Sequence, residues 1–143
     1  AALEEQLLSG LCRLQPVTGR RGGVECLVCH VAVRLEHRGR VLVQVGASEE
    51  GRGVRAACRL PCTKRKADEM PQEALERLLR TSLLALAPHI VVEGSDHSFD
   101  RHESGHFGVL TTCMQTVHRA RLQAPLGDVA MPTASAREPP EAP

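Results

Sequence analysis

The strongest pattern in this sequence is a single amphipathic helix between segments that alternate like β-strands. Residues 71–87 carry apolar side chains at helical spacing on one face, with charged side chains opposite. Asp68 or Glu69 lies near the expected cap, Pro71 falls in the first turn, and Pro88 ends the helix. The apolar stripe consists of Leu75, Leu78, Leu79, Leu83 and Leu86. The pattern predicts an α+β domain with this helix packed on a sheet.

Three segments before this helix have the two-residue period of half-buried strands. The first covers residues 27–36, the second covers 41–45 after a tight turn at 37–39, and the third covers 54–60, where Pro61 ends the ladder. We expect the first two to form a hairpin. All three together are expected to form an antiparallel meander.

The remaining elements lie at the two ends of the chain. A short helix is predicted over 3–14, and Pro16 ends it. After the main helix, strands are predicted at 90–92 and 107–117, separated by a polar loop at 94–105. The expected order is α-β-β-β-α-β-β, an antiparallel sheet of about five strands with one main helix packed on a face.

Length and composition favour one domain over 1–122, followed by a disordered Pro/Ala-rich tail over 123–143. The net charge is +1, and two Phe with no Tyr or Trp argue against a stacking platform. Six cysteines are too few for a disulfide scaffold, and no apolar run is long enough to span a membrane. We expect an intracellular protein, cytoplasmic or nuclear, without membrane contact. A start at Ala1 suggests a fragment of a longer chain.

The motif His102-Glu103-Ser104-Gly105-His106 matches the H-E-x-x-H pattern of zinc peptidases. On a helix both imidazoles would bind one zinc ion, and Glu103 would act as general base, giving a zinc-dependent hydrolase as one alternative. Gly105 and the following Val and Thr residues are poor helix formers. We therefore expect a loop that runs into a strand, with no metal. The same loop is rich in titratable side chains. It is interpreted either as a pH-sensitive loop that contacts a ligand or as a solvent-exposed connection between two strands.

Cysteine pairs form a second candidate metal site. Cys26 and Cys29 have the spacing of haem attachment or of half a zinc site, and Cys58 and Cys62 make a looser pair. Two residues three apart on a strand point to opposite faces, which prevents them from sharing a metal ion. We expect ordinary thiols and no cofactor.

Basic residues support a nucleic-acid-binding alternative. Several of them would share the outer face of the predicted sheet and meet phosphates there. The residues in question are Arg55, Arg59, Lys64, Arg65 and Lys66. The element order resembles in outline the double-stranded RNA-binding module, although the lysine-rich start of that module's last helix is missing. A solvated face or a nuclear-import signal explains the same residues.

The end of the main helix gives the positive argument for function. Residues 83–87 are apolar on nearly every side, whereas a sheet covers only about a 100° stripe of a helix. Leu84 falls outside that stripe and is expected to face another polypeptide, with Leu83 beside it. Leu7 and Leu11 of the first helix are the other candidates. We predict a non-enzymatic protein-protein interaction or assembly module without catalytic residues, binding another protein or a second copy of itself.

Overall fold

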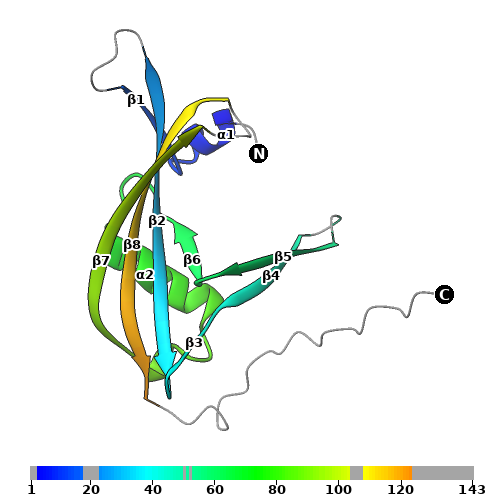
Figure 1. Cartoon of the computed structure of the whole chain (residues 1–143), viewed down its shortest axis with the longest axis vertical. Coiled ribbons are helices and arrows are strands. Elements are labelled where there is room, and N and C mark those ends of the chain that lie inside the picture. Colours follow the sequence, from blue (N-terminus) through cyan, green and yellow to red (C-terminus); the bar gives the residue numbers. More distant parts are fainter. Residues whose placement is uncertain (1–2, 18–22, 50, 52, 104–107, 124–143) are drawn as a thin grey trace, which may run out of the picture.

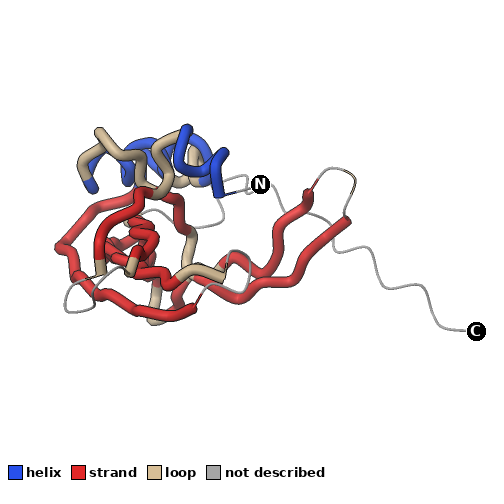
Figure 2. The backbone as a smooth tube through the Cα atoms, turned by 90° about the horizontal axis from the view of Figure 1, so that it is seen from above, coloured by secondary structure: helices blue, strands red, loops and turns tan. Residues whose placement is uncertain are grey.

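The fold was obtained as a computed structural model that describes residues 3–17, 23–49, 51, 53–103 and 108–123. It is an α+β fold, as predicted: a six-stranded sheet carries one main helix, and a separate two-stranded ribbon projects from the body (Figure 1). Seen from above, the helices lie on one side of the curled sheet and the ribbon extends away from it (Figure 2).

The six-stranded sheet is mixed, which corrects the purely antiparallel prediction. Its strands follow the path β1-β2-β8-β7, and β3 and β6 also pair with β2. The strands are β1 (Arg13–Pro16), β2 (Val24–His37), β3 (Arg40–Val41), β6 (Cys62–Lys64), β7 (Ile90–Glu103) and β8 (Leu110–Leu122). Every pairing is antiparallel except that of β2 with β8. The chain crosses from β2 to the other strands through the main helix. Strand β7 then runs opposite to β8, and β8 runs parallel to β2.

The two-stranded ribbon replaces the expected meander. Only Arg40 and Val41 pair with β2, and the chain then leaves the sheet. The ribbon consists of β4 (Gln44–Glu49) and β5 (Gly53–Arg59), which pair with each other. The alternation of apolar and polar residues correctly indicated strands in this region. It does not determine their partners, because β4 and β5 can pair with each other as well as with β2.

The helices begin and end at recognisable signals. The main helix, α2, spans Pro71–Ser82, and the Met70 backbone N–H donates to Glu73 Oε2 at 2.7 Å at its start. A short 3-10 turn follows at Ala87–His89. The first helix, α1, spans only Leu3–Leu8, because Gly10 adopts φ +71° and ends it. The prediction of a helix over 3–14 was therefore too long.

Strand β7 begins with the strand predicted at 90–92 and continues through residues 94–103, which were predicted as a polar loop. Its 14 residues pair with β8 along their length, with one irregularity between Val92 and Gly94. The strand does not alternate between apolar and polar residues because it lies at the sheet edge and nearly all of it is exposed. The following strand, β8, ends at Leu122, five residues beyond the predicted end. The predicted disordered tail from residue 124 onward lies outside the described residues.

The main core lies between α2 and the sheet. Leu75 and Leu78 of α2 are buried and Leu79 is partly buried, as the predicted stripe requires. Leu83 and Leu86 are also buried, but they lie beyond Ser82, where α2 ends, which corrects the predicted helix over 71–87. The sheet contributes Val31, Val33, Leu35, Ala120 and Leu122. A second, smaller cluster contains Cys12, Cys26 and Val28, with Leu3 and Leu7 packed against it. Among the described residues, the chain has no helix that is long and apolar enough to cross a membrane.

Candidate functional site

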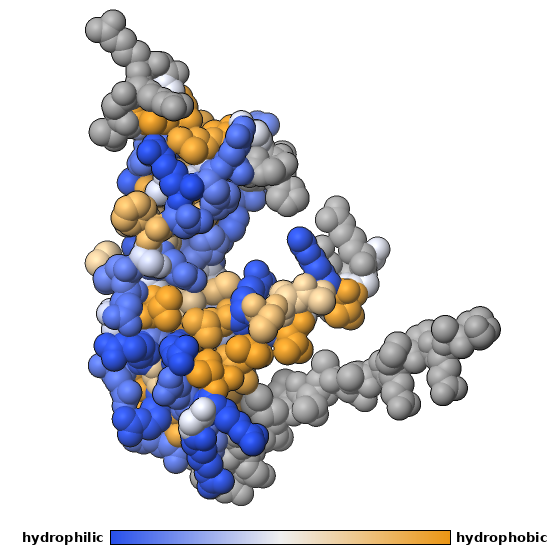
Figure 3. Space-filling view, in the orientation of Figure 1, coloured by the Kyte–Doolittle hydropathy of each residue, from blue (hydrophilic) through white to orange (hydrophobic). Residues whose placement is uncertain are grey.

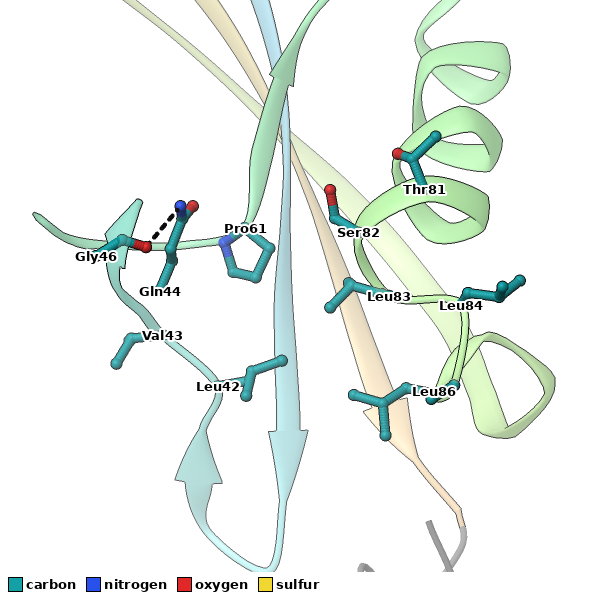
Figure 4. Close-up of a pocket in the computed structure, with 11 residues that line it drawn as sticks. Leu42, Val43, Gln44, Gly46, Pro61, Thr81, Ser82, Leu83, Leu84 and Leu86 are labelled. Atoms are coloured by element: carbon teal, nitrogen blue, oxygen red, sulfur yellow. Dashed lines mark hydrogen bonds between the residues drawn. The ribbon is translucent and has the colours of Figure 1, made fainter. Parts of the chain in front are cut away.

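An apolar groove of about 710 Å³ lies between the end of α2 and the segment that connects β3 to β4 (Figure 4). Leu42 faces Leu83 and Leu86 across it, and Pro61 lies between Gln44 and Ser82 in the same view. The remaining lining residues are Val43, Gln44, Gly46, Thr81, Ser82, Leu84 and Ala85. None of these side chains carries a charge, so the groove suits apolar side chains.

One wall of the groove is the turn that ends α2. The helix stops at Ser82, and the Leu86 and Ala87 backbone N–H groups both donate to the Leu83 carbonyl at 2.9 Å. This tight turn inserts Leu83 and Leu86 into the core. Leu84, between them, is 66% exposed and its side chain points away from Leu42 (Figure 4). Leu84 therefore forms the outer rim of the groove.

The other wall is the segment between β3 and β4. The Leu42 backbone N–H donates to the Leu35 carbonyl at 3.0 Å, and the Leu42 side chain packs against the core. Val43 follows and remains exposed. The Gln44 side-chain amide donates to the Gly46 carbonyl at 3.2 Å, which holds the chain as it turns into the ribbon. These contacts keep the groove open on its ribbon side.

Exposed apolar residues continue from the groove onto the ribbon. Val45 and Val54 are 75% and 80% exposed, and Figure 3 shows apolar residues gathered where the ribbon leaves the body and along it. A Cβ atom at Gly46 would lie 3.4 Å from the Val54 side chain and 3.2 Å from the Arg55 carbonyl oxygen. The absence of a side chain at Gly46 therefore lets β5 approach closely and joins the two apolar areas.

The predicted partner-binding residues occupy different environments. Leu84 is exposed at the groove rim as expected, whereas Leu83 is anchored in the core and lines the groove from inside. Leu7 packs against the second core cluster, Leu11 is half-buried, and Leu8 is the exposed leucine of α1. Leu42 and Val43 were not predicted as groove residues, because the alternation over 41–45 predicted a strand of the sheet.

The H-E-x-x-H motif does not begin on a helix. His102 and Glu103 are the last residues of strand β7, which corrects the predicted loop, and residues 104–107 lie outside the described part of the chain. His102 Nδ1 lies 3.4 Å from Asp100 Oδ2. The helical face that zinc peptidase chemistry requires is therefore not formed at the start of the motif. Within the described ranges, no group of three or more His, Cys, Asp or Glu residues is arranged to hold a metal ion.

The cysteines are free thiols in separate surroundings. Cys26 is buried in the second core cluster near Cys12, whereas Cys29 is half-buried and accepts a contact from the Arg65 guanidinium at 3.6 Å. Burial, followed by the hydrogen bond with Cys12, raises the pKa of the Cys26 thiol to about 11. Cys26, Cys29 and Cys62 lie in the main sheet, and Cys58 lies in the ribbon.

The basic residues do not share one sheet face, contrary to the nucleic-acid alternative. Arg55 and Arg59 are on the ribbon, and Lys64 is on the main sheet, where its ammonium group donates to Gln6 Oε1 at 2.6 Å. Arg65 is half-buried against Cys29, and Lys66 is exposed. The alternative depended on a continuous three-stranded meander, which does not form.

Comparison with known proteins gives a partial likeness to solved structures. No model of a protein family matches the chain, and no curated protein matches it. Among solved structures, a Nudix hydrolase from M. smegmatis is similar, with a TM-score of 0.43 and 22% sequence identity. The match covers 68% of this chain and 61% of the M. smegmatis protein. A likeness of this extent concerns part of the backbone alone.

Proposed function

We propose that this domain is a protein-interaction module that binds an apolar segment of another polypeptide in the groove beside Leu84. The observation that supports the proposal is the uncharged, apolar lining of the groove together with its exposed rim. Contiguous apolar surface on a small domain commonly marks an interface. Val45 and Val54 extend this surface along the ribbon, so the bound segment contacts both the body and the ribbon.

The groove also favours a particular kind of partner. Its polar groups are limited to the Gln44 amide and the hydroxyls of Thr81 and Ser82, which provide few contacts for a charged ligand. Burial of one exposed leucine or valine contributes about 1.5–3 kcal/mol. Two or three such side chains from the apolar face of an amphipathic helix or strand would contribute about 3–9 kcal/mol, from which the entropic cost of association is subtracted.

The lining chemistry supports a binding role rather than a catalytic one. General acid-base catalysis needs a side chain that titrates near the working pH, and nucleophilic catalysis by a hydroxyl needs a base beside it. None of the lining residues is a His, Cys, Lys, Asp or Glu. The Thr81 hydroxyl donates to the Arg77 carbonyl at 2.8 Å and serves the helix end.

Site-specific photo-crosslinking tests the proposal. A photoreactive phenylalanine analogue replaces Leu84 at the groove rim in one variant and Glu76 in the control, because Glu76 is exposed on α2 outside the groove. We expect a discrete cross-linked protein from position 84 that is missing from position 76. The identified partner is then titrated against the chain carrying Leu84→Glu, and we expect binding to weaken at least about tenfold.

Two results would contradict the proposed function. Cross-links of equal yield from positions 84 and 76 would show that the rim contacts proteins without selectivity. Unchanged affinity of the identified partner for the Leu84→Glu variant, when the variant melts like the wild type, would place the binding surface elsewhere.

A further inference from the structure

Strand β7 presents a long open edge. Within the described residues its neighbour in the sheet is β8, and its other side is unpaired (Figure 1). All of its 14 residues except Ile90 and Gly94 are exposed. The backbone N–H and C=O groups along such an edge are a template for pairing with a further strand.

Some of the usual protections of an open edge are missing here. Charged side chains, above all lysine, together with proline and bulges normally prevent edge pairing. Residues 90–103 contain neither lysine nor proline, and their charged residues are Glu93, Asp96, Asp100, Arg101 and Glu103. The irregularity between Val92 and Gly94 lies near the start of the strand, and the ladder with β8 continues without interruption from Gly94 to Glu103. A regular stretch of ten residues is therefore available for pairing.

An apolar spot lies in the middle of this stretch. Phe99 is 78% exposed and stands directly opposite Met114 of β8, which is also exposed. Two nearby charges are already paired within the chain: Asp96 Oδ2 lies 3.0 Å from Arg119 Nε, and Arg101 donates to Glu25. The desolvation cost of bringing a strand to this edge is reduced by these contacts.

We propose that two copies of this chain pair through β7 in antiparallel orientation, with the two-fold axis between their Phe99 residues. In such a pair, facing residues lie equally far from Phe99, one before it in the first copy and one after it in the second copy. The two phenylalanines then lie opposite each other. Asp96 faces His102 of the second copy, and Ser98 faces Asp100 of the second copy.

Apolar contact and charge together favour this register, which also places His97 opposite Arg101 of the second copy. An axis at His97 pairs Glu93 with Arg101 but leaves Phe99 opposite Ser95, without an apolar partner. An axis at Asp100 or Arg101 brings two identical charges together, and an axis at Ser98 places Asp96 opposite Asp100. The axis at Phe99 avoids these repulsions and places a carboxylate opposite an imidazole on both sides. The pairing joins two sheets into one continuous sheet. Because edge pairing buries little surface, we expect a reversible dimer of the weak class, below about 1,200 Å² of buried area.

Sedimentation of the full 143-residue chain over a wide concentration range tests the proposal. We expect a concentration-dependent dimer for the wild type, and a dissociation constant raised at least about tenfold by Phe99→Lys, which places two ammonium groups at the axis. Leu84→Lys is the matched control, because it charges another exposed apolar residue, at the groove rim and away from β7. Leu84→Lys should leave the dissociation constant of the dimer unchanged. An incorrect β7 dimer and an incorrect groove function would therefore give different results.

A charge exchange tests the register without changing Phe99. Asp96→Lys alone should weaken the dimer, and Asp96→Lys combined with His102→Glu should restore it, with circular dichroism confirming the fold of each variant. A wild-type chain that stays monomeric at the highest attainable concentration overturns the proposal. So does a dimer that Leu84→Lys disrupts and Phe99→Lys does not, or a double variant that is no stronger than the single one.

Discussion

Arg101 of β7 donates two hydrogen bonds to Glu25 of β2, at 2.7 and 3.0 Å, across the intervening strand β8. Glu25 also accepts from the Thr112 hydroxyl on β8 and from the Gln15 amide on β1, at 3.0 and 2.9 Å. One buried carboxylate thus contacts side chains from all the other strands along the path of the main sheet. The Gln15 hydrogen bond, followed by that of Arg101, lowers the pKa of this carboxyl group.

Loss of the Glu25 charge should destabilise the sheet. Glu25→Gln keeps the size of the side chain but turns an amide NH₂ group toward donors, so we expect a lower melting temperature at neutral pH. The control is Glu36→Gln, which removes an exposed pair with Arg34 and should change little. Thermal unfolding of both variants checks this. Equal losses would show that the four-strand contact adds nothing beyond a surface pair.

The contact between Glu69 and Arg77 should make stability depend on pH. Arg77 donates to both oxygens of Glu69, and this lowers the pKa of Glu69 from 4.5 to about 2. A lowered folded-state pKa contributes stability above pH 4.5, which is lost as the pH falls toward 2. We expect Glu69→Gln to cost about 1–3 kcal/mol in urea unfolding at pH 7 and much less near pH 2.

Glu76→Gln is the control for that experiment, because Glu76 is exposed on the same helix. It should leave the unfolding free energy within about 0.5 kcal/mol of the wild type. A pH-independent difference between Glu69→Gln and the wild type would contradict the assigned ionic contact.

The groove rim and the core should respond differently to substitution. Leu84→Glu changes an exposed side chain, so we expect the free energy of unfolding to stay within about 0.5 kcal/mol. Leu75→Ala opens a cavity under α2 and should cost about 2–5 kcal/mol. Denaturant unfolding measures both. If Leu84→Glu unfolds the domain, Leu84 belongs to the core and the proposed interface loses its main support.

The thiols should differ in their rates of alkylation. The thiolate is the reactive form, and Cys26 is buried with a pKa raised to about 11, whereas Cys58 is exposed on the ribbon. With limiting iodoacetamide under native conditions, we expect Cys58 to be modified first and Cys26 last. Peptide mass spectrometry at successive times gives the order. Early modification of Cys26 would show that the second core cluster opens readily.

Metal analysis addresses the H-E-x-x-H motif directly. Because His102 and Glu103 lie on a strand and not on the helix that the zinc motif requires, we expect no stoichiometric zinc in purified protein. About one zinc per chain that is lost in His102→Ala would contradict this expectation. A matched His89→Ala variant, changed at another exposed histidine, controls for adventitious binding.

The elements that were predicted correctly are those whose signals are local. Pro71 and the spacing of Leu75 and Leu78 are enough to place α2, because a helix makes its hydrogen bonds within itself. The alternation after Leu27 likewise identified β2. Leu84 is exposed as predicted, but it lies in the turn after α2 and not on the helical face from which that prediction was drawn.

The features that were missed depend on distant partners. No local pattern shows that β8 lies parallel to β2, or that Val45 and Val54 belong to a separate ribbon. Only residues 90–92 of strand β7 were predicted, because an exposed edge strand requires no apolar face. The groove could not be predicted for the same reason. Its second wall, at Leu42 and Val43, exists only because the chain leaves the sheet there.

The parallel pairing of β2 with β8 has a consequence for how the chain acquires its fold. His37 at the end of β2 contacts the backbone of Leu122, 85 residues later, and every pair along this central ladder has the same separation. Closure of so long a loop is entropically costly, which slows folding. During synthesis, β2 cannot pair with β8 until β8 has left the ribosome. Until then its apolar edge remains open to chaperones, or to the wrong strand.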